Sequence, residues 1–157
     1  VKAPIENLYD TYDINIYPFY AVSFKNIKLS YDIYKEGVKK FNLDINENYF
    51  NAGLYITSLN YWKQNNIKKN IIYIMKEHKK FKKGYFKLGT QPILNIAFHK
   101  KFKTIDKRWN STMLGYKNNL KKKYLDNAYV LHWTGKKKPW SKDGLYKDYW
   151  NEYNLIK

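Results

Sequence analysis

The spacing of apolar positions predicts two helices in the central third of the chain. Residues 67–80 place apolar side chains three and four positions apart, which is the period of an amphipathic helix. The shared face of that helix consists of Ile71, Ile74, Met75 and His78. A second helix is expected to begin at Thr90, with Thr90 as its N-cap and Pro92 in the first turn, where a missing N–H does no harm.

Short β-prone runs alternate with these helices. The expected strands cover residues 20–23, 50–57, 102–105 and 129–131. Further helical segments are expected at 31–41 after a Ser30 cap, at 59–62 and at 146–153, with loops at 3–10 and 118–123. Strands that alternate with helices predict an α/β layer fold.

Charge and length restrict the kinds of partner. The 157 residues suit one domain with a real core, and 30 basic against 13 acidic residues give a net charge of +17. Such a charge attracts phosphorylated substrates and anionic membrane surfaces, the latter by about 1 kcal/mol per nearby lysine. Specific nucleic-acid recognition is not expected. Bidentate hydrogen bonds to base edges and phosphates favour arginine, and Arg108 is the only arginine in the chain.

Several classes of site and location can be set aside. The absence of cysteine excludes disulfides, cysteine-zinc sites and thiol catalysis. No run approaches the ~18 apolar residues of a membrane-spanning helix, and no signal peptide is visible. We expect a cytoplasmic protein that can rest peripherally on the inner membrane face. The chain begins at Val1 rather than Met, so its start is expected to be a cut point.

The segment from His132 to Trp140 carries the clearest chemical pattern. An imidazole can ligate a divalent cation, a glycine at 135 lets backbone approach a phosphate, and Lys138 supplies a point charge. Trp140 is expected to be a packing anchor that fixes Lys138. These features predict part of a metal-diphosphate site. By contrast, His78 and His99 are expected to have structural roles.

Other short motifs precede this segment in a fixed order. They are Phe50-Asn51-Ala52-Gly53 followed by Leu59 and Trp62, then Gln91, Leu94 and Asn95, then Trp109-Asn110, and finally His132, Gly135 and Lys138-Pro139-Trp140. Taken together and in this order, they resemble the retaining glycosyltransferases of family 8. The resemblance covers essentially the whole chain.

The resemblance implies a fold and an activity. The fold would be a partial GT-A fold, which is a Rossmann-like nucleotide-diphospho-sugar transferase fold with a mixed sheet flanked by helices. Residues 1–157 would form a single domain, the C-terminal portion of a catalytic domain. The enzyme would transfer a hexose, galactose or glucose, from a UDP-sugar to a saccharide acceptor with retention, in lipopolysaccharide or surface glycan synthesis.

The resemblance also implies roles for individual residues. Gln91 would be catalytic, and the donor sugar would contact Asn51, Ala52, Thr90 and Gln91. The diphosphate would contact His132, Gly135 and Lys138, with His132 also binding Mn²⁺ or Mg²⁺.

Two departures from the family pattern stand out. Thr90 replaces an acid, and no Asp-x-Asp metal motif precedes the strand at Phe50. Two alternatives therefore stay open. The chain could be a truncated, catalytically silent fragment that binds a glycan or a partner, or it could be a basic binder of nucleic acid or anionic surfaces.

Overall fold

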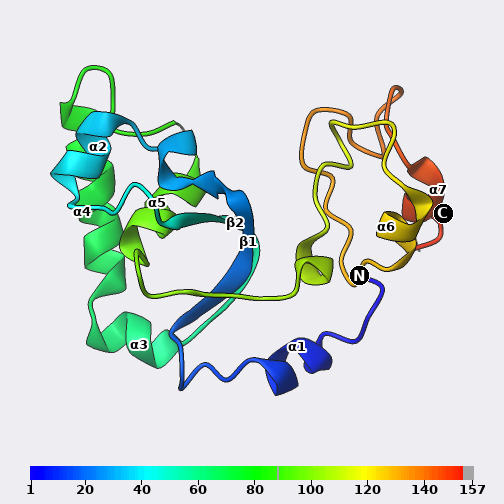
Figure 1. The fold of residues 1–157 in the computed structure, drawn as a ribbon, viewed down its shortest axis with the longest axis horizontal. Helices are drawn as coiled ribbons and strands as arrows, with labels where there is room; N and C mark the ends of the chain where they lie inside the picture. Colours follow the sequence, from blue (N-terminus) through cyan, green and yellow to red (C-terminus); the bar gives the residue numbers. More distant parts are fainter. Residues whose placement is uncertain (88, 154–157) are drawn as a thin grey trace. The chain divides into compact units, whose positions relative to one another are not determined.

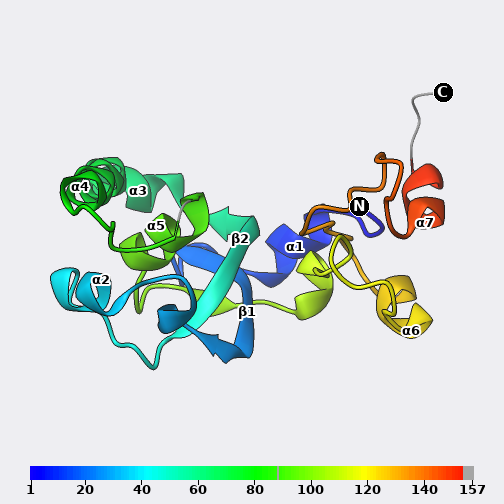
Figure 2. The same ribbon diagram turned by 90° about the horizontal axis from the view of Figure 1, so that it is seen from above.

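A computed structural model describes residues 1–87 and 89–153 of the chain. The protein divides into two compact units, each with its own core (Figures 1 and 2). We call Tyr12–Ile105 the sheet unit, and Val1–Thr11 together with Asp106–Lys157 the loop unit.

The sheet unit contains a mixed three-stranded sheet. Its strands are β1 (Phe19–Lys28), β2 (Asn48–Thr57) and β3 (Lys103–Thr104), in the order β2-β1-β3. β1 runs antiparallel to β2 and parallel to β3. The predicted strands at 20–23, 50–57 and 102–105 and the mixed sheet are thereby confirmed.

The described residues of the sheet unit also form five helices. They are η1 (Leu29–Tyr31), α2 (Lys35–Lys40), α3 (Leu59–Gln64), α4 (Ile67–Lys80) and α5 (Thr90–Ala97). α5 and η1 contact β2, α5 also contacts α4, and α4 and α5 lie on the same side of the β1–β2 pair (Figures 1 and 2). The predicted helix at 67–80 is confirmed at both ends.

Two helix starts differ from the sequence prediction. The N-cap of α5 is Gly89 with φ of 124°, and Thr90 is already the first helical residue. The helix expected from residue 31 begins only at Lys35. The residues of its predicted first turn instead pair with residues 85–86. Ile33 forms an isolated β-bridge with Phe86, and the Tyr34 N–H donates to the carbonyl of Tyr85 at 2.9 Å.

Aromatic rings fill the centre of the sheet unit. Phe19, Phe50 and Phe98 are fully buried, and the Phe19 ring centroid lies 4.9 Å from that of Phe50 and 4.3 Å from that of Phe98. Trp62 of α3 packs on Phe98 and donates its indole N–H to the Thr57 hydroxyl at 2.7 Å. Ring packing of this kind fixes α3 and α5 against β2.

The loop unit has little regular structure. Its helices are α1 (Glu6–Thr11), η2 (Lys107–Asn110), α6 (Lys122–Asp126) and α7 (Lys147–Asn151). Leu114, Leu125 and Trp133 form its small buried core. The strand predicted at 129–131 is wrong: the described residues show one isolated bridge there, between Leu131 and Ser111.

The local reason for that missing strand is a shared acceptor. The N–H groups of Tyr129 and Val130 both donate to the carbonyl of Arg108, so successive donors point to one oxygen instead of to opposite sides. Other boundaries also moved: the loop predicted at 3–10 contains α1, the loop at 118–123 ends inside α6, and the helix at 146–153 shortens to α7. In the described part of the chain, no helix has both the length and the apolar character needed to cross a membrane.

Candidate functional site

Two side chains of α5 form hydrogen bonds with the outward-facing backbone groups of β2. The Asn95 carboxamide accepts from the Phe50 N–H and donates to the Phe50 carbonyl, both at 3.0 Å. Gln91 Oε1 accepts from the Ala52 N–H at 3.0 Å. In the described sheet β2 is an edge strand, so these carboxamides act as the next strand would.

Helix and strand geometry explain why the two carboxamides fit. Four helical residues advance about 6 Å, and two strand residues advance about 6.6 Å. Carboxamides at positions 91 and 95 of a helix therefore match outward N–H groups at 52 and 50 of a strand. The motifs Phe-Asn-Ala-Gly and Gln-x-x-Leu-Asn are thus two halves of one hydrogen-bonded contact.

Polar groups surround this contact. The Asn51 carboxamide accepts from the Gly53 N–H at 2.9 Å, and Thr90 is exposed at the start of α5. The Tyr49 hydroxyl donates to Asp32 at 2.7 Å. Burial first, and then Asp32, raise the pKa of Tyr49 far above its ordinary value, so this phenol stays protonated.

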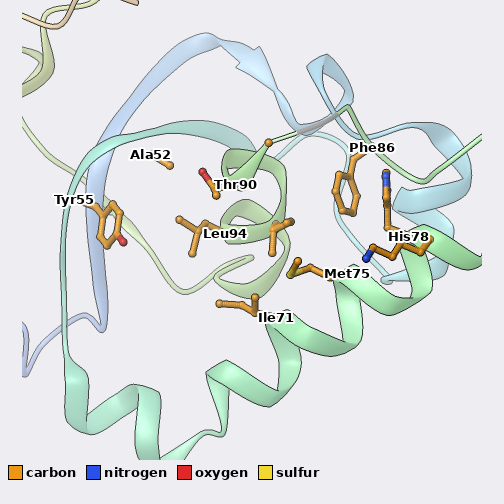
Figure 3. A pocket seen from close by; sticks show the side chains of 11 residues that line it. Ala52, Tyr55, Ile71, Met75, His78, Phe86, Thr90 and Leu94 are labelled. Atoms are coloured by element: carbon orange, nitrogen blue, oxygen red, sulfur yellow. The ribbon is translucent and has the colours of Figure 1, made fainter.

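An apolar pocket opens directly beside Ala52 and Thr90. Its volume is about 580 Å³, and side chains from β2, α4 and α5 enclose it (Figure 3). Ile71 and Met75 of α4 point toward Leu94 of α5, with Ala52 on the β2 side (Figure 3). The pocket lies wholly within the sheet unit.

In the loop unit, two glycines approach each other back to back. Gly135 has φ of 110°, and a Cβ placed on it would lie 2.5 Å from the Gly115 carbonyl oxygen. A Cβ on Gly115 would in turn meet the Thr134 carbonyl oxygen at 2.6 Å. The Gly115 N–H donates to that same carbonyl at 2.9 Å. Both positions require glycine, because any side chain would force the two segments apart.

His132 is held by its neighbours in a defined orientation. Its Nδ1 lies 2.8 Å from Asn110 Oδ1, and its backbone N–H donates to the Ser111 carbonyl at 2.8 Å. When Nδ1 carries the proton, Nε2 offers the lone pair that a metal needs. Burial, and then the charge of Lys138, lower the pKa of His132, which favours the neutral ligand form.

The lysine and tryptophan of the last motif behave differently from each other. Lys138 Nζ donates to the carbonyl of Trp133 at 2.5 Å, so its ammonium is positioned by backbone. Trp140 is 67% exposed and touches Trp150 at a ring distance of 5.3 Å. The expectation that Trp140 is a packing anchor that fixes Lys138 is therefore wrong. The packing role belongs to Trp133, which is buried and donates its indole N–H to the Leu145 carbonyl.

The residues present fit a metal at one position. No three His, Asp or Glu side chains gather within residues 1–87 and 89–153 in a way that could hold an ion. His132 has the orientation and the lowered pKa of a ligand, with Asn110 at its Nδ1. The other two histidines are structural, as predicted: His78 Nδ1 accepts from the Tyr85 N–H at 3.1 Å, and His99 Nε2 from the Asp44 N–H at 3.0 Å.

The structure thus gathers the predicted site residues into two groups. Asn51, Ala52, Thr90 and Gln91 meet in the sheet unit, whereas His132, Gly135 and Lys138 belong to the loop unit.

Sequence reasoning assigned no role to Asn95, Asn110 or Gly115, although the first two were part of the motifs. The four-residue spacing from Gln91 to Asn95 was a usable signal for the first of them. Gly115 offered no comparable signal, because its partner Gly135 lies twenty residues away.

Comparison with known proteins settles the family. Residues 1–144 match the family described as "Glycosyl transferase family 8". The chain belongs to this family. Among curated relatives, glycosyltransferase 8 domain-containing protein 1 of Danio rerio is 30% identical over 130 residues, and the human protein of that name is 30% identical over 129. Both matches cover 79% of this chain, which spans only about a third of the relatives' length (36% and 35%).

Solved structures of other glycosyltransferases share the fold. The galactosyltransferase LgtC, crystallised with donor and acceptor sugar analogs, superposes with a TM-score of 0.63 at 24% identity, covering 91% of this chain and 52% of LgtC. The bifunctional glycosyltransferase WbbM reaches a TM-score of 0.70 at 22% identity, covering 97% and 30% of the two chains. A partial GT-A fold is therefore established for this family 8 chain.

Proposed function

We propose that this chain is the C-terminal portion of one catalytic domain of a retaining hexosyltransferase. The enzyme transfers galactose or glucose from a UDP-sugar to a saccharide acceptor in lipopolysaccharide or surface glycan synthesis. Membership of family 8 supports sugar transfer in general. The specific donor, the stereochemistry and the acceptor class are the proposed part.

The observation that carries the proposal is the hydrogen bond between Ala52 and Gln91. It joins the two motifs assigned to the donor sugar and fixes the Gln91 carboxamide at a half-buried position. The Gln91 oxygen has a second lone pair beyond the one used by Ala52. We assign it to the sugar hydroxyls or to positive charge at the anomeric carbon, and assign Asn51 and Ala52 to sugar contacts.

In the loop unit, we assign His132, Gly135 and Lys138 to the diphosphate. The departing diphosphate gains negative charge as the sugar leaves, and an ammonium placed by backbone stabilises that charge without reorganising. Gly135 keeps side-chain atoms away from the oxygens. A Mn²⁺ or Mg²⁺ ion held in part by His132 would add a Lewis acid at the leaving group.

Thr90 is the residue through which sugar preference is expected to differ. Thr90 is the first residue of α5 and precedes Gln91, at the position where the family pattern has an acid. A hydroxyl still donates and accepts hydrogen bonds, but it offers no charge to a developing cation. We therefore expect Thr90 to bind the donor sugar with a smaller contribution to turnover than Gln91.

Two structures of one neighbour, LgtC, support the proposal. LgtC is a galactosyltransferase studied with both sugar analogs, and one of its structures carries an active-site glutamine replaced by glutamate. Gln91 supplies the same residue type in this chain. The net charge of +17 supports a cytoplasmic enzyme that works at the anionic inner membrane face.

A radiolabel assay tests the proposal. The chain is incubated with UDP-galactose or UDP-glucose and Mn²⁺, and release of the sugar is followed with and without a chelator. We expect metal-dependent release that falls at least about a hundredfold in Gln91→Ala, the usual loss for one electrostatic group in a transition state. His132→Gln should weaken metal dependence by about ten- to a hundredfold.

A silent, substrate-binding fragment is the second candidate. The threonine at position 90 and the lack of a three-ligand acidic cluster in the described residues favour it. Calorimetric binding of UDP with Mn²⁺, without sugar release, would assign the chain to this class. No binding of UDP with Mn²⁺ at millimolar concentration would contradict a donor site formed by these residues alone.

A further inference from the structure

The apolar pocket beside Ala52 and Thr90 is a partly open hollow that is too large to be a packing defect. Its volume of about 580 Å³ falls in the range of small-molecule sites. The walls come from three elements of one compact unit, so the pocket does not depend on the loop unit. Its apolar lining includes Ala52, Ile71, Met75, Phe86, Ile93 and Leu94.

The lining does not suit a saccharide. Ile71, Met75, Ile93 and Leu94 offer no hydrogen-bond partners for sugar hydroxyls, and burying hydroxyls without partners is costly. Nor does His78 help, because its Nδ1 is used by Tyr85 and its ring stacks on Phe86 at 4.0 Å. The floor and walls instead match hydrocarbon.

Polar side chains are a minority of the lining: they are Tyr55, His78, Lys79 and Thr90. Thr90 borders it on the side of the proposed donor-sugar residues, and Lys79, an exposed lysine, borders it on α4. No carboxylate is among its lining residues. A single cation at the edge of an apolar pocket complements an anionic group attached to a hydrocarbon.

We propose that the pocket binds the hydrocarbon chain of a lipid-linked saccharide acceptor, with the anionic linker of the lipid near Lys79. The role of this lipid as an acceptor rests on the proposed sugar transfer. The preference of the pocket for hydrocarbon depends only on the residues that line it. Because Ala52 and Thr90 belong both to the pocket edge and to the donor-sugar group, a lipid held there keeps its sugar beside the donor.

The two methionines of the chain provide a direct readout. Met75 lines the pocket in the sheet unit, whereas Met113 is a similarly exposed residue of the loop unit. In protein with ¹³C-labelled methionine methyl groups, octyl glucoside below its micelle concentration should shift the Met75 signal and leave Met113 in place. Methyl glucoside at the same concentration should shift neither.

Chain length and charge sharpen the result. Lengthening the alkyl chain from hexyl to octyl should lower the dissociation constant about fourfold for each buried methylene. Octyl phosphate should bind more tightly than octyl glucoside, and Lys79→Glu should weaken octyl phosphate alone by about fivefold. Lys76→Glu, an exposed lysine of α4 outside the pocket, is the matched control.

A second pair of variants blocks the pocket itself. Ile71→Glu places a charge in the wall, while Ile72→Glu changes an exposed neighbour that does not line it. We expect loss of alkyl binding in the first variant only, with circular dichroism and the Met113 signal confirming that both are folded.

Several results would overturn the assignment. Equal shifts at Met75 and Met113, binding that does not depend on chain length, or equal binding of methyl and octyl glucosides would each contradict it. The absence of any shift would also contradict it, as expected if another segment or a second copy of the chain fills the pocket. These measurements need no UDP-sugar, so failure of sugar release with intact alkyl binding would sink the proposed function alone. If sugar is released but an alkyl-linked acceptor is used no better than its methyl glycoside, the acceptor role is wrong.

Discussion

The sheet unit and the loop unit are stabilised by different means. In the sheet unit, long elements present apolar faces, and α4, α5 and β2 bury a continuous aromatic core. In the loop unit, the described helices have six residues or fewer, and the segments are joined by single backbone hydrogen bonds and a close contact of two glycines. A small core around Trp133 completes it.

The contrast bears on function. The proposed donor-sugar residues lie on the rigid helix and strand of the sheet unit, where a buried asparagine fixes their backbone. The proposed diphosphate residues lie on loops, whose shape depends on backbone conformations that only glycine adopts without strain. Substitutions that remove the characteristic contacts of each unit should therefore change its stability in different ways.

Among the sheet-unit variants, the largest effect is expected for Asn95→Leu. The change keeps the branching and the number of side-chain heavy atoms but leaves the Phe50 N–H and carbonyl buried without partners, so we expect a loss of about 3 kcal/mol in the free energy of unfolding. Chemical denaturation measures it. Gln91→Leu is the matched control: it frees one half-buried N–H and should cost about 1 kcal/mol. Equal losses in the two variants would contradict the assigned role of Asn95.

Gly135→Ala is the corresponding destabilising substitution in the loop unit. The new methyl group meets the Gly115 carbonyl at a positive φ, and we expect a loss of about 2 kcal/mol in the free energy of unfolding. Gly89→Ala tests the contribution of φ alone, because its φ of 124° is as unfavourable but no atom lies within 4 Å of the added Cβ. A loss of about 1 kcal/mol is expected there. Thermal unfolding of both variants decides whether the close contact matters.

Acid should weaken both units, and histidine variants should tell them apart. Burial lowers the pKa of His78, His99 and His132 below the ordinary value of 6.5, so each binds a proton more readily in the unfolded chain. The stabilisation is complete above 6.5 and is lost as the pH falls through the folded pKa values. In the sheet unit, protonation also removes the acceptors that His78 and His99 offer to backbone N–H groups.

The measurement is a series of melting curves between pH 7.5 and 5, alongside NMR titration of the three imidazoles. We expect His132→Gln to reduce the acid sensitivity and to leave the titrations of His78 and His99 unchanged. A pKa of His132 above 6.5 in the folded chain would refute the account of its burial and of its neutral ligand form.

The smallest effect is expected for Trp140→Ala. This side chain is largely exposed, so its removal should change the free energy of unfolding by no more than about 0.5 kcal/mol. Trp133→Ala, which empties part of the core and frees the Leu145 carbonyl, should cost about 3 kcal/mol or more. Similar losses from the two tryptophans, measured by denaturation, would restore Trp140 as a packing anchor.

Sequence periodicity predicted the elements of the sheet unit better than those of the loop unit. The residue spacing predicted α4 at both ends and located β2 and α5, because each element buries one regular face. The strand at 129–131 and the loop at 3–10 were predicted wrongly. In the loop unit, pairing is decided by distant partners: Tyr129 and Val130 share the Arg108 carbonyl, and Lys2 donates to Tyr129. No local pattern encodes those contacts.

By itself the sequence determined the family, the α/β class and the residues of the two motif groups, since motif order and apolar period are local or sequential properties. Tertiary structure alone decided that Gln91 and Asn95 complete the edge of β2, that Gly115 and Gly135 touch, and that an apolar pocket opens beside Thr90. These features depend on atoms brought within a few ångströms from separate segments. Hydrogen bonds and steric contacts act only at that range, so they appear once the chain has folded.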